Sequence, residues 1–411
     1  MSLVRFFKLK TAALFHDPPH KPWVLFRPIK HKGHEEEAKK LLEQVVRATI
    51  LKGSEQFIGR EPVSQVDRMA SSVERYILSL LLSNWKPGAL PVREIKLKNI
   101  LSPHLEVKLD QCLDDNRLEE FKRELSNILK QVDELSKNLA EDERARLLYT
   151  VLHIILEPLW VSSGLPLGPG DTRVPTHTVF DHNYACATFM NWFVGGDRPS
   201  GYLVSIDVAG VHRFIESSRK LVDLWASSYL VSLLSWYSIR EFLVKLGPDV
   251  LILPSPRFNP FLYHTMLVEL KRLNQKAEDL INKLSEIIKE GTGGLYDPLK
   301  PGFPMHAYVP GRLLLVLPSG QYIKDIVKDE LKSCRDMKHA IACYIQNRFR
   351  EGWRKLYEVL EEAFSEEGVE RLIKKLLEKS GVIGGQESRA YKWGFAKEPP
   401  ISVRVIVIDV R

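Results

Sequence analysis

The strongest constraint on the fold is a change in residue pattern near the middle of this 411-residue chain. A stretch rich in Gly, residues 194–201, separates two parts of different character. Before it, apolar residues recur at helical spacing, most clearly over 65–82 and 118–156. After it, short apolar runs of strand length alternate with longer helical segments. We therefore predict an α+β protein in which an all-helical domain, residues 1–198, precedes a mixed domain, residues 199–411.

The mixed domain contains four segments with the composition of buried strands: 202–208, 250–253, 313–317 and 402–410. A long helix is predicted over 210–246, between the first two strands, and a charged helical region over 324–379 follows the third. The resulting order of strand, helix, strand, strand, helix, strand is that of a ferredoxin-like domain, here with helical insertions.

Composition excludes few classes of function. The net charge of +7 is modest for this length, so charge alone does not decide whether the chain contacts nucleic acid. Without an apolar run of about 18 residues or a signal-peptide pattern, a cytoplasmic protein with no membrane contact is expected. No C-x-x-C pair is present, so we expect reduced, mostly buried thiols rather than zinc knuckles or disulfides at the four cysteines, Cys112, Cys186, Cys334 and Cys343.

Candidate metal ligands lie in the helical part. His16 and Asp17 end the first predicted helix, and an imidazole beside a carboxylate can bind one divalent cation. Asp67 lies on a later helix, and His182 follows Asp181 at the start of another. Ligands in HD-superfamily phosphohydrolases occur as His, then His-Asp, then Asp. The order here, His-Asp, Asp and then His, is the order expected after circular permutation of that domain.

A series of motifs then gives a resemblance that covers the whole chain in collinear order. The motifs are HDPPHKPW, GHEEEAKKLL, VDRMASS, DTRVPTHTVFDH, FIESSRKLVDLWASSYLVSLL, GPDVLILPSPRFNPF and VPGRLLLVLPSG. Together they resemble the large subunit of type III-B CRISPR complexes, the Cmr subtype of the CRISPR polymerase family. The resemblance implies the N-terminal half of such a subunit, with a permuted HD domain followed by a first palm domain.

The same resemblance implies the activity and partners. It implies an RNA-guided antiviral complex whose HD domain cleaves single-stranded DNA with a divalent metal, Mn, Ni, Co or Mg. Partners would be the other Cmr-type subunits, CRISPR RNA, target RNA and the single-stranded DNA substrate. The catalytic metal ligands would be His16, Asp17, Asp67 and His182, with His34 for a second metal. Further candidates around this site are His20, Lys21, His177 and Asp181.

The palm-like part implies a nucleotide site. In the family, the helix predicted over 210–246 borders an ATP site shared by two palm domains, which makes candidates of Arg219, Lys220, Ser227 and Ser228. Apolar positions on the same helix are expected to pack as core against the sheet: Leu224, Trp225, Leu230 and Leu234. Asp207 ends the first strand, where a catalytic palm holds a metal carboxylate, but the family's first palm is not the catalytic one.

The family's second palm, with its Gly-Gly-Asp-Asp motif and cyclic oligoadenylate synthesis, has no counterpart in this sequence. Gly195-Gly196-Asp197-Arg198 and Gly293-Gly294-Leu295 come nearest to the motif and are predicted to be loops. We therefore expect a truncated or naturally split subunit that makes no cyclic oligoadenylate alone. A separate second-palm polypeptide would dock on an exposed surface around Tyr229, Trp236 and Phe261.

Two other functions fit the sequence. The chain could be a scaffold of the same complex, with vestigial metal ligands and only a nucleotide-binding surface. It could also be a freestanding HD phosphohydrolase acting on nucleotides, although such an enzyme has no use for the palm-like part.

Overall fold

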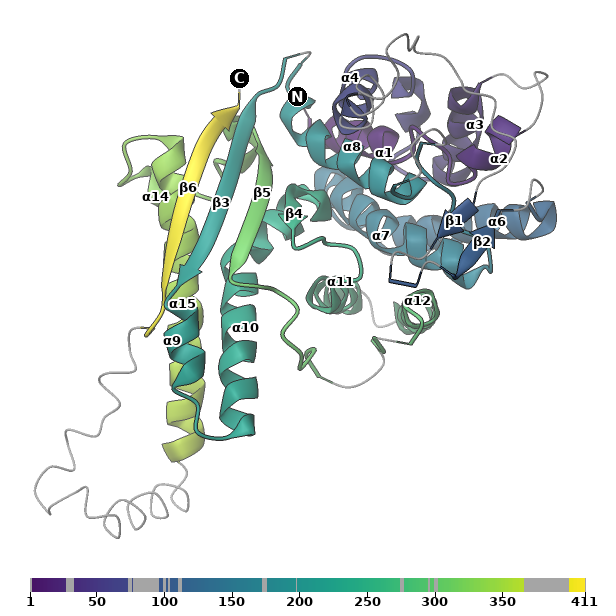
Figure 1. Ribbon diagram of the computed structural model, residues 1–411. Coiled ribbons are helices and arrows are strands. Elements are labelled where there is room, and N and C mark those ends of the chain that lie inside the picture. Colours follow the sequence, from purple (N-terminus) through teal and green to yellow (C-terminus); the bar gives the residue numbers. More distant parts are fainter. Residues whose placement is uncertain are drawn as a thin grey trace, which may run out of the picture.

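The computed structural model describes residues 2–26, 33–72, 76, 96–98, 101–102, 104–109, 113–171, 176–196, 198–273, 277–294, 296–298, 302–365 and 399–410. Within these ranges, a helical part made from the first half of the chain lies beside a part built on an antiparallel sheet (Figure 1). The mixed α+β class predicted from the sequence is confirmed.

The helical part is assembled around α7, Glu141–Ser162, whose side chains are buried on all sides from Ala145 to Trp160. By length and composition α7 could cross a membrane, but 89% of its most apolar window is buried inside the protein, as in the central helix of a folded domain. Around it are α1 (Leu3–Leu14), α2 (Lys21–Phe26), α3 (His34–Val46), η1 (Ser54–Phe57), α4 (Val63–Ala70), α6 (Asp115–Leu135) and α8 (Val179–Phe193).

The sequence predicted an all-helical first domain, but this part of the structure also contains strands. Two short strands, β1 (Lys96–Lys98) and β2 (Glu106–Lys108), pair antiparallel with Leu97 opposite Val107. Each strand places one apolar residue between two charged ones, which is a strand pattern too short to detect by periodicity. The helix predicted over 65–82 begins as α4, and its segment beyond residue 76 lies outside the described residues.

The second part contains a four-stranded sheet with the order β4-β5-β3-β6, in which every neighbouring pair is antiparallel. The strands are β3 (Gly201–Ala209), β4 (Leu251–Leu253), β5 (Arg312–Pro318) and β6 (Ser402–Val410). The two long helices, α10 (Leu221–Leu246) and α15 (Met337–Ser365), run side by side along this sheet (Figure 1). The chain order is therefore the one that the sequence predicts.

The helix expected over 210–246 is broken near its start. It consists of α9 (Val211–Glu216) and α10, separated by residues 217–220. Within this break the Ser217 hydroxyl donates to the carbonyl of Phe214, and the Asp223 carboxylate accepts the Lys220 N–H as the new helix begins. Serine and aspartate side chains that bond to nearby backbone compete with helix continuation, which explains the break.

Helices α11 (Pro260–Leu273) and α12 (Glu278–Gly291) are inserted between β4 and β5, and α12 packs on α7 of the helical part (Figure 1). At Gly291 a β-carbon would lie 2.4 Å from the Cα of Pro158, so only glycine permits this close approach. One buried hydrophobic cluster consequently extends through both parts of the chain.

Shorter helices complete the described fold. These are η2 (Pro248–Val250), which follows α10, and α13 (Gly320–Ile323) and α14 (Lys328–Leu331), which precede α15. The predicted charged helical region over 324–379 is thus α14 and α15, with its end outside the described residues. Gly293 and Gly294, both with positive φ, form the turn after α12, as expected for a loop. The other predicted loop is Gly195-Gly196-Asp197-Arg198, of which Asp197 lies outside the described residues.

Candidate metal centre

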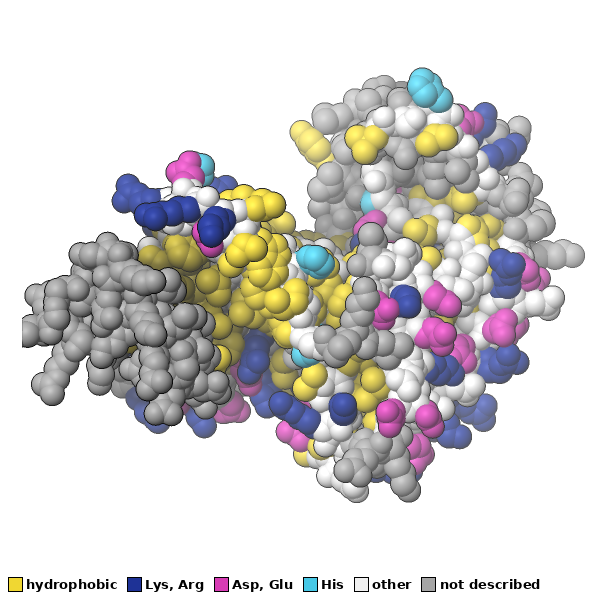
Figure 2. Space-filling model, turned by 90° about the horizontal axis from the view of Figure 1, so that it is seen from below, with side chains coloured by type: hydrophobic (Ala, Val, Ile, Leu, Met, Phe, Trp, Pro, Cys, Tyr) yellow, Lys and Arg dark blue, Asp and Glu magenta, His cyan; other side chains and the backbone are white. Residues whose placement is uncertain are grey.

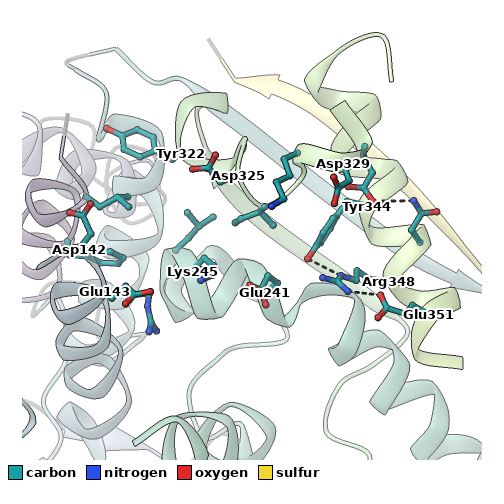
Figure 3. Close-up of a pocket in the computed structure, with 18 residues that line it drawn as sticks. Asp142, Glu143, Glu241, Lys245, Tyr322, Asp325, Asp329, Tyr344, Arg348 and Glu351 are labelled. Carbon is teal, nitrogen blue, oxygen red and sulfur yellow. Dashed lines mark hydrogen bonds and ion pairs between the residues drawn. The ribbon is translucent and has the colours of Figure 1, made fainter. Parts of the chain in front are cut away.

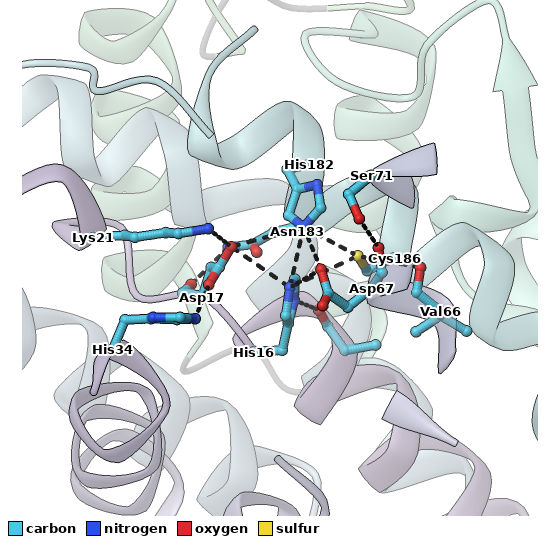
Figure 4. A network of polar contacts seen from close by, with 11 residues as sticks. His16, Asp17, Lys21, His34, Val66, Asp67, Ser71, His182, Asn183 and Cys186 are labelled. Atoms are coloured by element: carbon cyan, nitrogen blue, oxygen red, sulfur yellow. Dashed lines mark hydrogen bonds and ion pairs between the residues drawn. The ribbon is translucent and has the colours of Figure 1, made fainter. Parts of the chain in front are cut away.

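Four candidate ligands from three separate segments meet in the helical part (Figure 4). His16 and Asp17 follow the end of α1, Asp67 lies on α4, and His182 lies in the first turn of α8. Helices α1 and α4 both pack against α8, which brings these segments together. The convergence that the residue order predicts is present in the structure.

The donor atoms are closely spaced. The Nε2 atoms of His16 and His182 are 3.2 Å apart, and Asp67 Oδ1 lies 3.1 Å from His182 Nε2 and 3.6 Å from His16 Nε2. Asp17 Oδ2 is 3.6 Å from His16 Nε2 and 3.7 Å from His182 Nε2. Three of the four side chains are buried, and Asp67 is about one-third exposed.

Neighbouring groups hold two of these ligands in position. The Nδ1–H of His16 donates to the carbonyl of Ala13 at 3.0 Å, which leaves Nε2 facing the other donors. The amide of Asn183 donates to the backbone carbonyl of Asp17 at 2.8 Å and so ties α8 to the segment after α1. Metal-binding histidines are commonly oriented as His16 is, by a hydrogen bond from the ring nitrogen that does not face the metal.

Asp17 connects the cluster to two more basic groups. Its Oδ2 accepts Lys21 Nζ at 2.5 Å, and His34 Nε2, at the start of α3, lies 3.4 Å from Oδ1. Burial alone would raise the pKa of the Asp17 carboxyl, but Lys21 and His16 outweigh burial and hold that pKa well below its usual range. Asp17 is therefore a carboxylate at neutral pH.

The neighbouring acidic groups also shift the pKa values of the two histidines, His16 and His182. Burial would lower the pKa of His182, but Cys186 and a hydrogen bond to Asp67 outweigh burial and raise that pKa to about 9. For His16, burial also opposes protonation, and Cys186 and Asp17 together raise its pKa well above the usual value. The cluster thus favours positive charge between its donors.

The sequence interpretation missed Cys186, which it treated as a buried thiol. Its Sγ lies 3.8 Å from His182 Nε2 and 3.9 Å from His16 Nε2, and the three donor atoms lie within 4.8 Å of one another. The available signal was the spacing, because Cys186 lies four residues after His182 and so on the same helix face.

The donor set fits a divalent cation. Imidazole nitrogens and carboxylate oxygens are ligands for Mn, Fe, Co, Ni and Zn, and bonds of about 2.0–2.2 Å to a shared ion place neighbouring donors roughly 3.3 Å apart. Asp17 Oδ1 is buried, and its nearest basic group is the His34 imidazole at 3.4 Å. The other oxygen of this carboxylate, Oδ2, lies 3.6 Å from His16 Nε2 and 3.7 Å from His182 Nε2 and is the one placed to share an ion with them.

The further candidates have other positions. His20 lines a small separate cavity with Trp23 and Glu37. The His177 ring is 6.0 Å from that of His182, near the cluster. Asp181 caps α8 through Thr178 and pairs with the guanidinium of Arg257, a residue that the sequence interpretation did not single out. Both Asp181 oxygens have protein partners, so Asp181 holds α8 in place.

Arg257 reaches this region from the loop after β4, in the sheet part. Its guanidinium contacts both oxygens of Glu157 on α7, at 2.7 and 2.6 Å, as well as Asp181. The guanidinium carbon also lies 5.0 Å from the ring centre of Tyr184. The sheet part therefore contacts the helix that carries His182 and Cys186.

The nucleotide candidates lie at the other end of the sheet part, where α10 begins. Arg219 and Lys220 are exposed and Ser228 is half-buried. Ser227 is buried, and its hydroxyl lies 3.2 Å from that of Ser218 and donates to the Leu224 carbonyl. Basic side chains are thus accessible there, whereas the Ser227 hydroxyl has protein partners.

The apolar residues of α10 do not lie as predicted. Leu224 and Trp225 were expected in the core, but they are 42% and 43% exposed, and Trp225 stacks on Tyr229 with ring centres 5.5 Å apart. Leu230 is half-buried and Leu234 is buried. This end of the molecule faces the viewer in Figure 2, where hydrophobic side chains gather over much of the sheet part.

The predicted exposure of a surface around Tyr229, Trp236 and Phe261 is wrong for two of the three residues. Trp236 and Phe261 are buried, and they pack edge-to-face with ring centres 6.0 Å apart. The inserted helix α11 carries Phe261 into the core, against Trp236 of α10. The exposed apolar residues of α10 lie instead at its start, at Leu221 and Val222.

A cavity of about 610 Å³ lies apart from the histidine cluster, between α1 and α7 on one side and α15 on the other (Figure 3). Its lining is highly charged, and several charges pair with each other, as Arg348 does with Glu351. A pocket for an organic ligand is usually mostly apolar. This cavity is therefore a charged seam between the two parts.

Comparisons with known proteins agree with this organisation. A family model described as "CRISPR-associated protein Cmr2, N-terminal" matches residues 203–358. The CRISPR system CMR subunit Cmr2 of Saccharolobus solfataricus is 34% identical over 392 residues, which make up 90% of this chain and 35% of that protein. The chain belongs to the Cmr2 family. A second Cmr2 subunit, from Pyrococcus furiosus, is 27% identical over 301 residues, 62% of this chain and 32% of that protein.

Solved structures match this Cmr2-family chain along almost its whole length. The type III-B Cmr-beta cryo-EM structure in the apo state gives a TM-score of 0.69 at 30% identity, covering 98% of this chain and 37% of the matched one. The Cmr-beta structure bound to cognate target RNA gives 0.66 at 29% identity, covering 98% and 36%. The chain spans about a third of the length of the curated Cmr2 relatives that it matches.

Proposed function

We propose that this Cmr2-family chain is part of a type III-B CRISPR effector complex and carries a metal-dependent nuclease site for single-stranded DNA in its helical part. The observation that supports the site is the convergence of His16, Asp67 and His182, with Asp17, on donor spacings that suit one cation. In this proposal residues 1–198 are the permuted HD domain and residues 199–411 the first palm domain.

The ion would be held by His16, Asp17, Asp67 and His182, with His34 available beside Asp17 for a second one. A bound divalent cation lowers the pKa of water and neutralises charge on a phosphate, which is the chemistry that phosphodiester hydrolysis needs. Mn, Co, Ni and Mg are all candidates. Lys21, whose ammonium lies at the edge of the cluster beside Asp17, would contact the scissile phosphate.

The test is cleavage of a labelled single-stranded DNA by the purified chain with Mn²⁺, Co²⁺, Ni²⁺ or Mg²⁺. We expect cleavage by the wild-type chain and a loss of at least about 100-fold in the His182→Ala and Asp67→Asn variants, because each removes an ion ligand. Asp329→Asn, which changes an exposed carboxylate in the sheet part, should cleave like the wild type. Equal cleavage by all four proteins would mean a contaminating nuclease.

The same assay separates the two alternatives. A non-catalytic scaffold of the complex would bind its partners but cleave nothing with any of these ions. A freestanding phosphohydrolase would release phosphate from free nucleotides and leave DNA intact. Preferential cleavage of single-stranded DNA is the outcome that supports the proposed function over both.

The sheet part is proposed to contribute assembly and nucleotide contacts. The target-RNA-bound Cmr-beta relative supports the other Cmr subunits, CRISPR RNA and target RNA as partners. At the start of α10, Arg219 and Lys220 lie beside the exposed Leu221 and Val222, so a phosphate and an apolar partner surface could be contacted together. ATP shared with a second palm domain is the proposed ligand there.

Cyclic oligoadenylate synthesis is not proposed for this chain. Phosphoryl transfer from ATP needs carboxylates that hold the metal ions on the triphosphate, and no Gly-Gly-Asp-Asp motif occurs in the sequence. Asp207, the candidate carboxylate on β3, pairs with Arg312 across the sheet at 3.2 Å. Incubation of the purified chain with ATP and target RNA should yield no cyclic product.

A further inference from the structure

We propose that Cys186 supplies a thiolate ligand to the cation of this site, so that the centre prefers a borderline or soft divalent ion such as zinc, cobalt or nickel over magnesium. The inference rests on the proposed metal site and specifies its metal class. It differs from a site of imidazoles and carboxylates alone, which also accepts hard ions.

The geometry supports this assignment. With metal–nitrogen bonds of about 2.0–2.1 Å and a metal–sulfur bond of about 2.3 Å, a tetrahedral ion places sulfur roughly 3.6 Å from each nitrogen and the nitrogens roughly 3.3 Å apart. The observed sulfur–nitrogen distances are 3.8 and 3.9 Å, and the nitrogen–nitrogen distance is 3.2 Å. The thiol is therefore as well placed as the imidazoles to share one ion.

Burial and neighbouring groups also favour a ligand. Cys186 is fully buried, and its sulfur faces the two Nε2 atoms rather than an entirely apolar surface. The second observation is the Asp17 carboxylate, whose Oδ2 lies 3.6 Å from His16 Nε2 and 3.7 Å from His182 Nε2 and so faces the same ion position. An ion bonded to Cys186, His16 and His182 would also neutralise this carboxylate.

The competing role for Cys186 is packing. Its Sγ lies 3.8 Å from the carbonyl of Val66, to which a neutral thiol can donate a weak hydrogen bond between α8 and α4. In that role the thiol keeps its proton and has no bond to an ion. When the thiol acts as a ligand, it loses that proton to solvent and the sulfur lone pair bonds to the cation.

Cobalt(II) distinguishes the two roles without any measurement of activity. CoCl₂ is titrated into the metal-free chain and the absorption spectrum is recorded. We expect visible bands of a low-coordinate cobalt site together with a near-ultraviolet thiolate-to-cobalt charge-transfer band. Cys186→Ser should abolish the near-ultraviolet band, keep weaker visible bands and reduce cobalt affinity at least about tenfold. The matched variants Cys334→Ser and Cys343→Ser change half-buried thiols elsewhere and should keep the full spectrum.

The outcomes separate the inference from the proposed function. Visible cobalt bands that disappear in Asp67→Asn, without a near-ultraviolet band in the wild type, would overturn the thiolate ligand and leave the metal site intact. Absence of any cobalt binding would overturn the metal site itself, and the inference with it. If Cys186→Ser does not fold, X-ray absorption of the zinc-loaded wild-type chain decides: sulfur scattering at about 2.3 Å supports the ligand, and a shell of nitrogen and oxygen alone refutes it.

Discussion

Lys10 and Asp249 form an ion pair of 2.9 Å in which both side chains are completely buried. Lys10 lies on α1, six residues before His16, whereas Asp249 follows α10 in the sheet part. Asp249 Oδ2 also accepts the Asn191 amide at 2.8 Å, and Asn191 lies on α8. One carboxylate of the sheet part therefore contacts both α1, which precedes His16, and α8, which carries His182.

Loss of the Lys10–Asp249 ion pair should destabilise the folded chain. Lys10→Met keeps an unbranched side chain but leaves Asp249 as an uncompensated buried charge, so we expect the free energy of unfolding to fall by about 3–5 kcal/mol. Adding Asp249→Leu removes that charge and should restore part of the loss. Denaturant unfolding measures both, with the exposed Lys52→Met as a control within about 0.5 kcal/mol of the wild type. Equal midpoints for Lys10→Met and the wild type would contradict the role of the pair.

Arg257 should couple stability to the metal site. Arg257→Ala leaves the Glu157 and Asp181 carboxylates without their cation, so we expect a loss of about 3 kcal/mol in unfolding free energy. Because Asp181 immediately precedes His182, cobalt affinity should also fall. Arg272→Ala, an exposed arginine on α11, is the matched control. Unchanged cobalt affinity in a folded Arg257→Ala variant would show that this contact does not position His182.

Metal binding should stabilise the folded chain. An ion that binds only the folded state at 100 times its dissociation constant adds about 2.7 kcal/mol, so removal of the metal with EDTA should lower Tm by several degrees. Asp67→Asn removes a ligand and should show little or no difference between EDTA and saturating zinc or cobalt. The wild-type shift should persist in Asp329→Asn. An equal shift in Asp67→Asn would place the bound ion somewhere else.

Glu351 should make the stability of the folded chain depend on pH in a way that a single substitution can measure. Partial burial would raise its pKa, but hydrogen bonds from Lys355 and Arg348 outweigh burial and lower that pKa to about 2. A carboxyl whose pKa is lower in the folded state stabilises the protein above its unfolded value, near 4.5, and loses this contribution as pH falls toward 2.

The Tm difference between the wild type and Glu351→Gln should therefore be largest near neutral pH and shrink below about pH 4.5. The side chain is 37% exposed, so the contribution is below about 1 kcal/mol. Glu43→Gln, at an exposed position of α3, should show no such trend. A difference that grows on acidification would have the wrong sign for this network.

The part of the candidate site that could be predicted from the sequence is the part defined by residue type and by order along the chain. His16, Asp17, Asp67 and His182 were chosen from their order along the chain, and packing brings them together. Cys186 was not chosen, because a lone cysteine is usually only a buried thiol, and its contact depends on how α8 packs on α1 and α4. Arg257 could not be found either, because its partners come from helices far away in the sequence.

The fold shows the same limit. Apolar periodicity and strand-like runs predicted the order of strands and long helices in the sheet part. They did not identify the buried face of α10, since apolar residues occur all around this helix. Trp236 is buried against Phe261 of the inserted α11. Trp225, in contrast, is exposed and stacks on Tyr229 of its own helix. Such differences depend on tertiary contacts that local spacing does not encode.

The wide separation of the contacting residues determines when the site can form during synthesis. His16 and His182 lie 166 residues apart, and Lys10 contacts the carbonyl of Leu246, 236 residues further along the chain. As the chain leaves the ribosome, α1 is complete long before any partner for its buried lysine or its histidine has been translated. Helix α1 must therefore wait for α8 and then for the end of α10, so an ion at the proposed site would bind a largely folded chain instead of guiding the first steps of folding.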